Sequence, residues 1–313
     1  MGTLRPGFVH SPAYEMDIGA HVFITSKFRR YREASEREGL LQPHEVEAPH
    51  AADDAELLAV LEAEYLADLR GYRHTARTRR SELPLSREIV EGCVLCAGGS
   101  ILAVRRAVER GCAIHFGGGY HHGFAGHAEG FCYINDAAIA AAVALRRGWA
   151  SRVAVIDTDV HQGNGTARIF AGEDRVFTFS IHQENLYPMK ERSDLDIGLA
   201  DECGTSVYLR ELERGLRVVL DQFQPDLALY LGGVDPYEHD RLGGVGVTME
   251  GMAERERLVL GALAEHGIPF ATFTAGGYAL DPDDTVRLHV LTARAALEAF
   301  ERDGHRLQRR AAE

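Results

Sequence analysis

One stretch of the chain carries the step from fold to chemistry: VIDTDVHQGNG, from Val155 to Gly165. The run Val153–Ile156 predicts a buried strand, because short apolar runs bounded by polar turns are typical of strands covered on both faces. Asp157, Asp159 and His161 follow at once, and a glycine-spaced turn with two amides comes next. Polar groups that follow a buried strand indicate a parallel sheet with a functional site at its carboxyl edge.

Similar apolar runs alternate with longer amphipathic segments along the whole chain. Strands are predicted at Gly7–His10, Ala113–Phe116, Val153–Ile156, Val176–Ser180, Leu227–Leu231 and Phe270–Thr274. Helices are predicted at Asp54–Arg70, Arg87–Arg110, Asp136–Arg147, Val207–Gln222 and Met249–His266, with Asn135 and Asp136 as caps of the third. This alternation predicts an α/β fold, a parallel sheet with helices on both faces. No long linker or internal repeat divides the chain, so we expect one domain over residues 1–313.

The composition limits the classes of partner. The net charge of −13 argues against a nucleic-acid backbone or an anionic membrane as the main partner. The sequence has no apolar run of about 18 residues that could span a membrane, and its first residues lack the apolar stretch of a secretory signal. The five cysteines are few and odd in number, which suits a reducing compartment. We therefore expect a cytoplasmic protein, and the sequence carries no signature of an oligomeric state.

Two conspicuous motifs are predicted to be structural. Cys93 and Cys96 form a C-x-x-C, but no second pair follows at the spacing of a zinc finger, and the surrounding residues are apolar at helical spacing. They are predicted to be core cysteines. The basic run Arg70–Arg80 lacks interleaved aromatic residues, and the chain as a whole is acidic. It is predicted to be a solvated loop rather than a binding strip.

Four predicted strands lead into glycine-containing polar segments. These are GGGYHH at 117–122, DTDVHQGNG at 157–165, VDPYEHDRLGG at 234–244 and AGGYAL at 275–280. Glycine allows the backbone to approach other groups closely or to adopt positive φ. A single acid at a strand end is usually a turn residue, but four such exits that converge at one sheet edge indicate a site.

The second segment supplies candidate metal ligands. Asp157, Asp159 and His161 are spaced by two, so all three share one side of an extended chain and the spacing does not select among them. A third ligand must come from another exit, and Asp235 is the natural candidate. Asp159, His161 and Asp235 with open positions would suit a catalytic zinc ion. The oxygen ligands leave Fe(II) as an alternative.

The other exits supply acid–base groups. Of the neighbouring His121 and His122, one can act as general base towards a water and the other as acid or electrostatic partner. The hydroxyl of Tyr278 can donate to a developing oxyanion. Together these groups predict metal-assisted hydrolysis of an amide.

These motifs resemble those of the histone deacetylase superfamily. GGGYHH, GFCYIND at 130–136, DTDVHQGNG, the Asp235 segment with DRLGG and AGGY occur in the order and approximate spacing of that superfamily, over nearly the whole chain. HQGNG, LYP at 186–188 and DRLGG are most similar to the class IV branch and its bacterial relatives. The resemblance implies a single arginase/deacetylase-type domain with an eight-stranded, mainly parallel sheet.

The resemblance also implies residue roles. Zinc would be held by Asp159, His161 and Asp235, with His122 as general base, His121 as its partner oriented by Asp157, and Tyr278 as carbonyl polariser. Phe131 and Tyr187 would line a tunnel for acyl-lysine, with Gly130 and Gly276 beside the substrate. A structural potassium ion is implied close to the zinc, at Asp157, Ser180 and Ile181.

Asn164 differs from many relatives, which carry an aspartate there. The amide can accept a hydrogen bond from His122 but cannot stabilise its imidazolium by charge. We therefore expect a lower pKa for His122, which favours the neutral, base-competent form.

The predicted function is a zinc-dependent deacetylase or deacylase of N-acyl-lysine in proteins or peptides. Acetylpolyamines and other small acylated amines are alternative substrates. A catalytically silent acyl-lysine binder is disfavoured because every catalytic position of the pattern is occupied. A dimanganese ureohydrolase would need further bridging aspartates. The small residues of GFAGHAEG at 123–130 predict space beside the metal for acyl groups longer than acetyl.

Overall fold

Eight parallel strands form the centre of the molecule in the computed structural model, which describes residues 5–311. Their order across the sheet is β2-β1-β3-β8-β7-β4-β5-β6. The strands are β1 (Gly7–Val9), β2 (Val46–Glu47), β3 (Cys112–His115), β4 (Val153–Asp157), β5 (Val176–Gln183), β6 (Leu195–Leu199), β7 (Leu227–Leu231) and β8 (Phe270–Phe273). The prediction of an α/β fold is confirmed, and the sheet is parallel throughout rather than mainly parallel.

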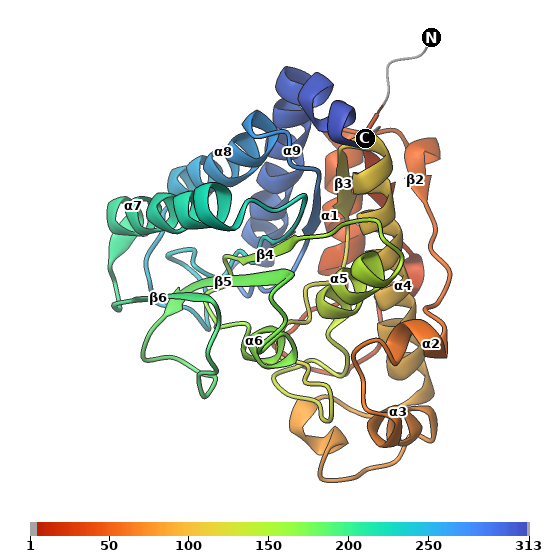
Figure 1. The fold of residues 1–313 in the computed structure, drawn as a ribbon. Coiled ribbons are helices and arrows are strands. Elements are labelled where there is room, and N and C mark those ends of the chain that lie inside the picture. Colours follow the sequence, from red (N-terminus) through yellow and green to blue (C-terminus); the bar gives the residue numbers. More distant parts are fainter. Residues whose placement is uncertain (1–4, 312–313) are drawn as a thin grey trace.

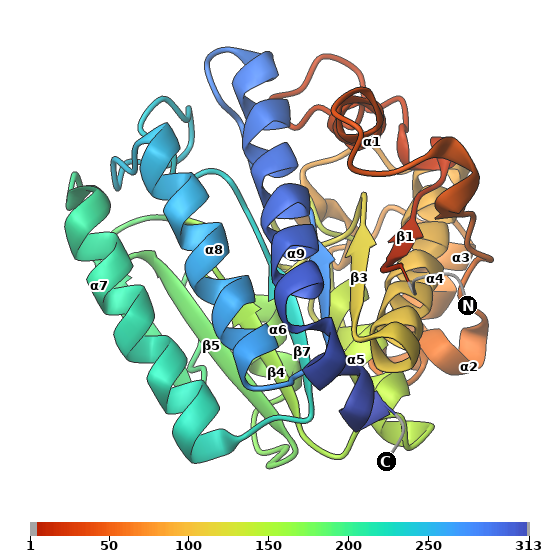
Figure 2. The ribbon, with the colours of Figure 1, turned by 90° about the horizontal axis from the view of Figure 1, so that it is seen from above.

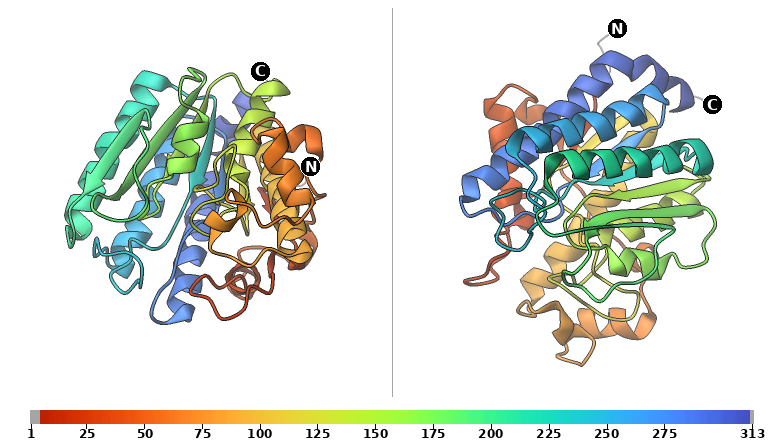
Figure 3. Two further views of the ribbon diagram at one scale, coloured as in Figure 1. Left: turned by 90° about the horizontal axis from the view of Figure 1, so that it is seen from below. Right: turned by 90° about the vertical axis from the view of Figure 1, so that its left-hand side faces the viewer.

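Helices cover both faces of this sheet (Figure 1). They are α1 (Lys27–Arg37), α2 (Asp54–Leu57), α3 (Ala63–Arg70), α4 (Arg87–Arg110), α5 (Asp136–Arg146), α6 (Asn164–Ile169), α7 (Gly204–Arg217), α8 (Met249–Glu265) and α9 (Pro282–Ala311). Three short 3₁₀ turns lie at Pro12–Tyr14, Pro43–Glu45 and Thr78–Ser81, and a π-helical turn at Val218–Phe223 continues α7. Figures 2 and 3 show α7, α8 and α9, in teal to dark blue, side by side over one face of the sheet.

The core has two halves because side chains alternate across a strand. Val153 and Val155 of β4 belong to the half that contains α4 and α5. Ala154 and Ile156 point the other way, into the half that contains α7, α8 and α9. Every residue of β4 is buried, and this double burial is the reason that the strand is a continuous apolar run in the sequence.

Several elements differ from the prediction. The predicted helix Asp54–Arg70 is divided into α2 and α3, because the chain turns between them and the Glu62 N–H donates to the Ala125 carbonyl. Strands β2 and β6 and helices α1, α6 and α9 were not predicted. Strand β6 lies at the edge of the sheet with alternate residues exposed, so it lacks the apolar run by which the central strands were found.

The predictions for Asn135, Cys93 and Cys96 are confirmed, whereas the buried Asp136 is not a cap: it is the first residue of α5, and its carboxylate accepts from the Gly119 and Tyr120 N–H groups. Asn135 caps α5, since its side chain accepts a hydrogen bond from the Ala138 N–H at 2.9 Å. Cys93 and Cys96 are buried free thiols in α4. The basic run is not one loop, because it begins at the last residue of α3 and ends in the 3₁₀ turn Thr78–Ser81. Four of its arginines, Arg70, Arg73, Arg77 and Arg80, pair with nearby acids. Within the described residues, no helix has the length and apolar character to cross a membrane.

The expectation of one domain over residues 1–313 remains a prediction. Residues 1–4 and 312–313 of that range lie outside the described residues.

Candidate active site

The four polar exits meet because their strands are neighbours. Strands β3, β8, β7 and β4 are consecutive in the sheet, although they are far apart in the sequence. Their carboxyl ends therefore lie side by side at one edge, where parallel α/β proteins place their sites.

Asp159, His161 and Asp235 form a buried cluster at this edge. Each offers one ligand atom within 4.8 Å of the others. Nδ1 of His161 lies 3.1 Å from Oδ1 of Asp159 and 3.2 Å from Oδ2 of Asp235. Asp157 was predicted on the same side of the chain as Asp159 and His161, but its carboxylate faces His121 instead. The structure thus separates Asp157 from the other two, which the spacing alone could not do.

The cluster is one that a divalent cation would fit. Burial and the charge of Asp159 raise the pKa of Asp235 to about 7. Although burial lowers it, hydrogen bonds to Asp159 and Asp235 raise the pKa of His161 to about 10. Two buried carboxylates need positive charge close by, and the donor set of two carboxylates and an imidazole suits a metal ion.

Gly276 leaves the space in which the two carboxylates sit. A Cβ atom at this position would lie 2.3 Å from Oδ2 of both Asp159 and Asp235. The Gly276 N–H donates to Oδ2 of Asp159 at 2.8 Å. Glycine at 276 therefore lets the backbone lie close to both carboxylates, and its N–H holds the carboxylate of Asp159 in place.

The two histidines have different partners. His121 Nδ1 donates to Oδ2 of Asp157 at 2.7 Å, whereas His122 Nδ1 lies 2.8 Å from Oδ1 of Asn164. Although burial lowers it, the charges of Asp157 and Asp159 raise the pKa of His121 to about 9. Burial and the nearby imidazoles of His121 and His161 hold the pKa of His122 well below its ordinary value. One ring is thus suited to carry a proton and the other to accept one.

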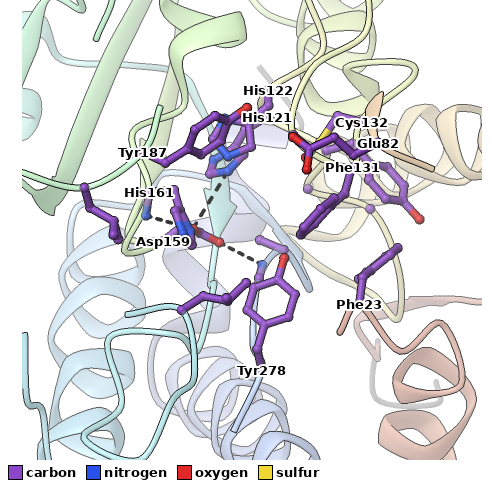
Figure 4. A pocket seen from close by; sticks show the side chains of 18 of the residues that line it. Phe23, Glu82, His121, His122, Phe131, Cys132, Asp159, His161, Tyr187 and Tyr278 are labelled. Carbon is purple, nitrogen blue, oxygen red and sulfur yellow. Dashed lines mark hydrogen bonds and ion pairs between the residues drawn. The ribbon is translucent and has the colours of Figure 1, made fainter. Parts of the chain in front are cut away.

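Tyr278 and several aromatic rings enclose the space in front of these groups (Figure 4). Figure 4 shows Tyr278 across the cavity from the histidine pair, with Phe131 and Phe23 along a third side. Burial and the charges of Asp159 and Asp235 raise the pKa of Tyr278 well above its ordinary value. Its hydroxyl therefore keeps its proton at neutral pH and can act as a hydrogen-bond donor.

The cavity has a volume of about 270 Å³. Gly130, Phe131, Tyr187 and Gly276, the four residues predicted beside the substrate, all line it. The ring of Phe131 lies 6.2 Å from that of Tyr278, and the ring of Tyr187 lies 5.5 Å from that of His122. Tyr187 is 45% exposed, so it stands at the mouth of the cavity.

Of the segment 123–130 after the histidine pair, which was predicted to leave space beside the metal, Gly130 lines the cavity. Residues 123–129, all of them described, are not among the lining residues. Phe124 stacks on His127 within the loop itself. A part of the wall is instead formed by Phe23, Phe28, Tyr120 and Cys132. Phe28 belongs to α1 and Phe23 to the segment before it, and neither was predicted to be part of the site.

Lys27 and Asp240 hold the AGGY turn from two sides. The buried Lys27 donates through Nζ to the Ala275 carbonyl at 2.6 Å. Asp240 Oδ2 accepts from the Tyr278 N–H at 2.7 Å. Ala275 has a φ of 54°, a conformation that such contacts help to maintain. A lysine in an amphipathic segment gives no sign of burial in a sequence, whereas Asp240 could have been found from its place in DRLGG.

The predicted potassium-site residues are also neighbours. Asp157 of β4 and Ser180 of β5 are register partners in the sheet, and Ile181 follows. Ser180 Oγ lies 2.9 Å from Nδ1 of His182. The ion itself remains a prediction.

Fold and site together define an α/β protein of the arginase/deacetylase fold, with an acid–imidazole–acid cluster and a histidine pair at the sheet edge. The family model for the histone deacetylase domain matches residues 21–294, and the chain belongs to the histone deacetylase family. The resemblance predicted from the motifs is thereby confirmed. Family membership supports a deacetylase that acts on acylated substrates.

Known proteins resemble the chain over most of its length. An uncharacterized protein of Picosynechococcus sp. is 41% identical over 295 residues, which are 93% of this chain and 98% of that protein. Histone deacetylase 2 of Arabidopsis thaliana is 30% identical over 289 residues, 88% of this chain and 75% of that protein. Histone deacetylase 1 of Homo sapiens is 27% identical over 266 residues, 77% of this chain and 54% of that protein.

Proposed function

We propose that the protein is a zinc-dependent deacylase that hydrolyses the amide of N-acyl-lysine in proteins or peptides. The observation that carries this proposal is the convergence of the acid–imidazole–acid cluster, the histidine pair and Tyr278 on one cavity. Its aromatic walls suit the methylene stem of a lysine side chain. We further propose that the protein is cytoplasmic and closest to the class IV branch.

Asp159, His161 and Asp235 would hold the catalytic ion. Their two carboxylates and one imidazole match zinc, with Fe(II) as the alternative. When bound, this ion would supply Lewis acidity, which polarises a carbonyl and makes a water more acidic. A potassium ion at Asp157 and Ser180 would be structural.

The residues of the chain then divide the proton transfers. His122, neutral because of its low pKa, would take a proton from the water whose oxygen attacks the acyl carbon. Tyr278 would donate a hydrogen bond to the carbonyl oxygen as it gains negative charge. His121, which holds a proton beside Asp157, would place positive charge next to the oxygen that becomes negative. The proton that His122 has taken from the water would pass to the nitrogen of the leaving amine. The C–N bond breaks, and a carboxylate and a free amine are released.

A second candidate substrate is an acylated polyamine or another small acylated amine. The carboxylate of Glu82 lines the cavity, and a second cationic nitrogen on the substrate would be attracted to it. The acidic net charge of the chain acts in the same direction.

The test is a panel of acyl-lysine peptides and acylated polyamines, assayed with zinc-loaded protein and with Fe(II)-loaded protein under exclusion of oxygen. We expect release of free amine that chelation abolishes, zinc restores and a hydroxamate inhibits. Higher kcat/KM on peptides than on polyamines would support the leading proposal. Binding of acyl-lysine peptides without any hydrolysis would identify a silent binder and overturn it.

A further inference from the structure

A chain of polar side chains runs from the protein surface to His122. Arg80, in the 3₁₀ turn at the end of the basic run, pairs with Oε2 of Glu129. Oε1 of Glu129 accepts from Nδ2 of Asn164 at 2.9 Å. Oδ1 of Asn164 lies 2.8 Å from Nδ1 of His122. Neither Arg80 nor Glu129 has a place in the function described so far.

Glu129 is buried and firmly held. It is 8% exposed, and its backbone N–H and carbonyl both pair with Cys132, at 3.0 Å and 2.8 Å. Asn164 is anchored at the start of α6, where its Oδ1 also accepts from the Gly165 N–H at 3.0 Å. The carboxylate and the amide therefore meet in a fixed geometry rather than by chance on a mobile surface.

A carboxylate is the group that this position requires. Glu129 stands between two donors, the guanidinium of Arg80 and the amide nitrogen of Asn164. A carboxylate accepts through both oxygens, whereas a glutamine would have to turn its own N–H₂ towards one of the donors.

The orientation of the Asn164 amide decides which nitrogen of His122 carries the proton. Nδ2 donates to Glu129 at 2.9 Å and to the Met189 carbonyl at 3.4 Å, while Oδ1 accepts from the Gly165 N–H at 3.0 Å. Oδ1 therefore faces the ring, so Nδ1 of His122 is the donor. The other nitrogen, Nε2, is then unprotonated, as a base requires. If the amide were reversed, its N–H₂ would face Nδ1 and the proton would move to Nε2.

We propose that Glu129, held by Arg80, is a positioning residue that sets the amide of Asn164 and thereby the base-competent tautomer of His122. The role of His122 as base rests on the proposed function, whereas the tautomer does not. The basic run thus contributes its last arginine to the site. An aspartate at 164 would place its negative charge directly beside the His122 ring. Here the nearest carboxylate on this path is that of Glu129, and the uncharged amide of Asn164 lies between it and the ring.

A double-mutant cycle separates this role from a merely structural one. In Glu129→Gln, the charge of Arg80 draws the single remaining oxygen, so the amide nitrogen faces Nδ2 of Asn164. This donor–donor contact favours reversal of the Asn164 amide, whereas the Gly165 N–H and the Met189 carbonyl favour its present orientation. We expect kcat to fall by about 10²-fold, within the range that a general base or its tautomer contributes. In Asn164→Asp, two carboxylates meet where the 2.9 Å hydrogen bond now lies, and activity should also fall.

The combination Glu129→Gln with Asn164→Asp should be more active than either single variant. The introduced glutamine then donates to the introduced aspartate and accepts from Arg80, so every hydrogen bond is restored. Losses that simply add in the double variant would overturn the proposal, because independent structural damage is additive. Arg79→Gln, an exposed neighbour in the same turn, is the control and should keep wild-type kcat.

A second measurement needs no catalysis. Correlation spectra of ¹⁵N-labelled, metal-free protein report which ring nitrogen of His122 is protonated, with His122→Ala for assignment. We expect an Nδ1–H tautomer in the wild type and the appearance of the Nε2–H tautomer in Glu129→Gln. An unchanged tautomer would overturn the proposal, even if the enzyme assay succeeded. A wild type without activity on the whole panel would instead refute the proposed function and leave this readout standing.

Arg80→Gln keeps the proposal testable if Glu129→Gln does not fold. The Arg80 side chain is 53% exposed, so its loss should leave thermal unfolding unchanged. Without this partner Glu129 is held less firmly, and a mixture of His122 tautomers is expected in the same spectra. A pure Nδ1–H tautomer would show that Arg80 has no part in the arrangement.

Discussion

The hydroxyl of Tyr278 is a single group whose removal tests the proposed stabilisation of the carbonyl oxygen. Tyr278→Phe removes one donor and leaves the ring, so the fold and metal content should survive. Loss of one such donor typically costs about 10²–10³-fold in kcat. The measurement is kcat on an acyl-lysine peptide, with metal content as control. A variant within about threefold of wild type would exclude Tyr278 as polariser.

The pKa of His122 offers a second test at a single side chain. It lies well below its ordinary value because of burial and the imidazoles of His121 and His161. A carboxylate at 164, introduced together with Glu129→Gln, adds negative charge beside Nδ1 and should raise that pKa. Protonation then removes the base at a higher pH, so the acidic limb of kcat/KM should move to higher pH than in the wild type. If the acidic limb does not move, His122 is not the base whose pKa the profile reports.

The turn after β8 packs against both carboxylates of the proposed metal centre through Gly276. Gly276→Ala would place a methyl group 2.3 Å from both Asp159 and Asp235, so we expect lost metal binding and lost activity. Gly304→Ala is the matched control, since its nearest contact is 3.8 Å and it lies in α9. There the change should be neutral or stabilise by about 0.4–1 kcal/mol. Wild-type metal content in Gly276→Ala would contradict the proposed centre.

The loops after β4 and β7 must both contribute if the ion bridges them. Asp159→Ala and Asp235→Ala should each abolish bound zinc, measured by elemental analysis of the purified protein. Asp174→Ala, an exposed aspartate in the same region of the chain, should retain it. One zinc per chain in both ligand variants would exclude this set of ligands.

The cavity as a whole sets the acyl group that fits. Part of its wall is apolar, from Phe23, Phe28, Tyr120 and Cys132, and each buried CH₂ contributes about 0.8 kcal/mol. We therefore expect a higher kcat/KM on an octanoyl-lysine peptide than on the acetyl peptide of the same sequence. Phe23→Ala should extend the preference towards longer chains. A clear preference of the wild type for acetyl would refute the expectation.

Strand exits and motif order were sufficient to predict the fold class and the residues that meet at the sheet edge. Buried strands are apolar throughout, so polar groups at the ends of several neighbouring strands indicate a shared site. The cluster of Asp159, His161 and Asp235 was predicted in this way, and the structure brings its members together. The edge strand β6 was missed because its apolar residues alternate with exposed ones and form no continuous apolar run. The division between α2 and α3 was missed because it depends on a contact with a distant loop.

Only the tertiary structure shows which of two similarly placed residues contacts which partner. Asp157 and Asp159 lie on the same side of the chain, and they differ only in their neighbours. His121 lies beside Asp157, and Asp235 lies near Asp159. Glu129 and Arg80 were not recognised, because they are 49 residues apart and reach His122 through a third segment. Local spacing determines the side of a strand on which a group lies. Its partner depends on strand order and loop packing, which long-range contacts determine.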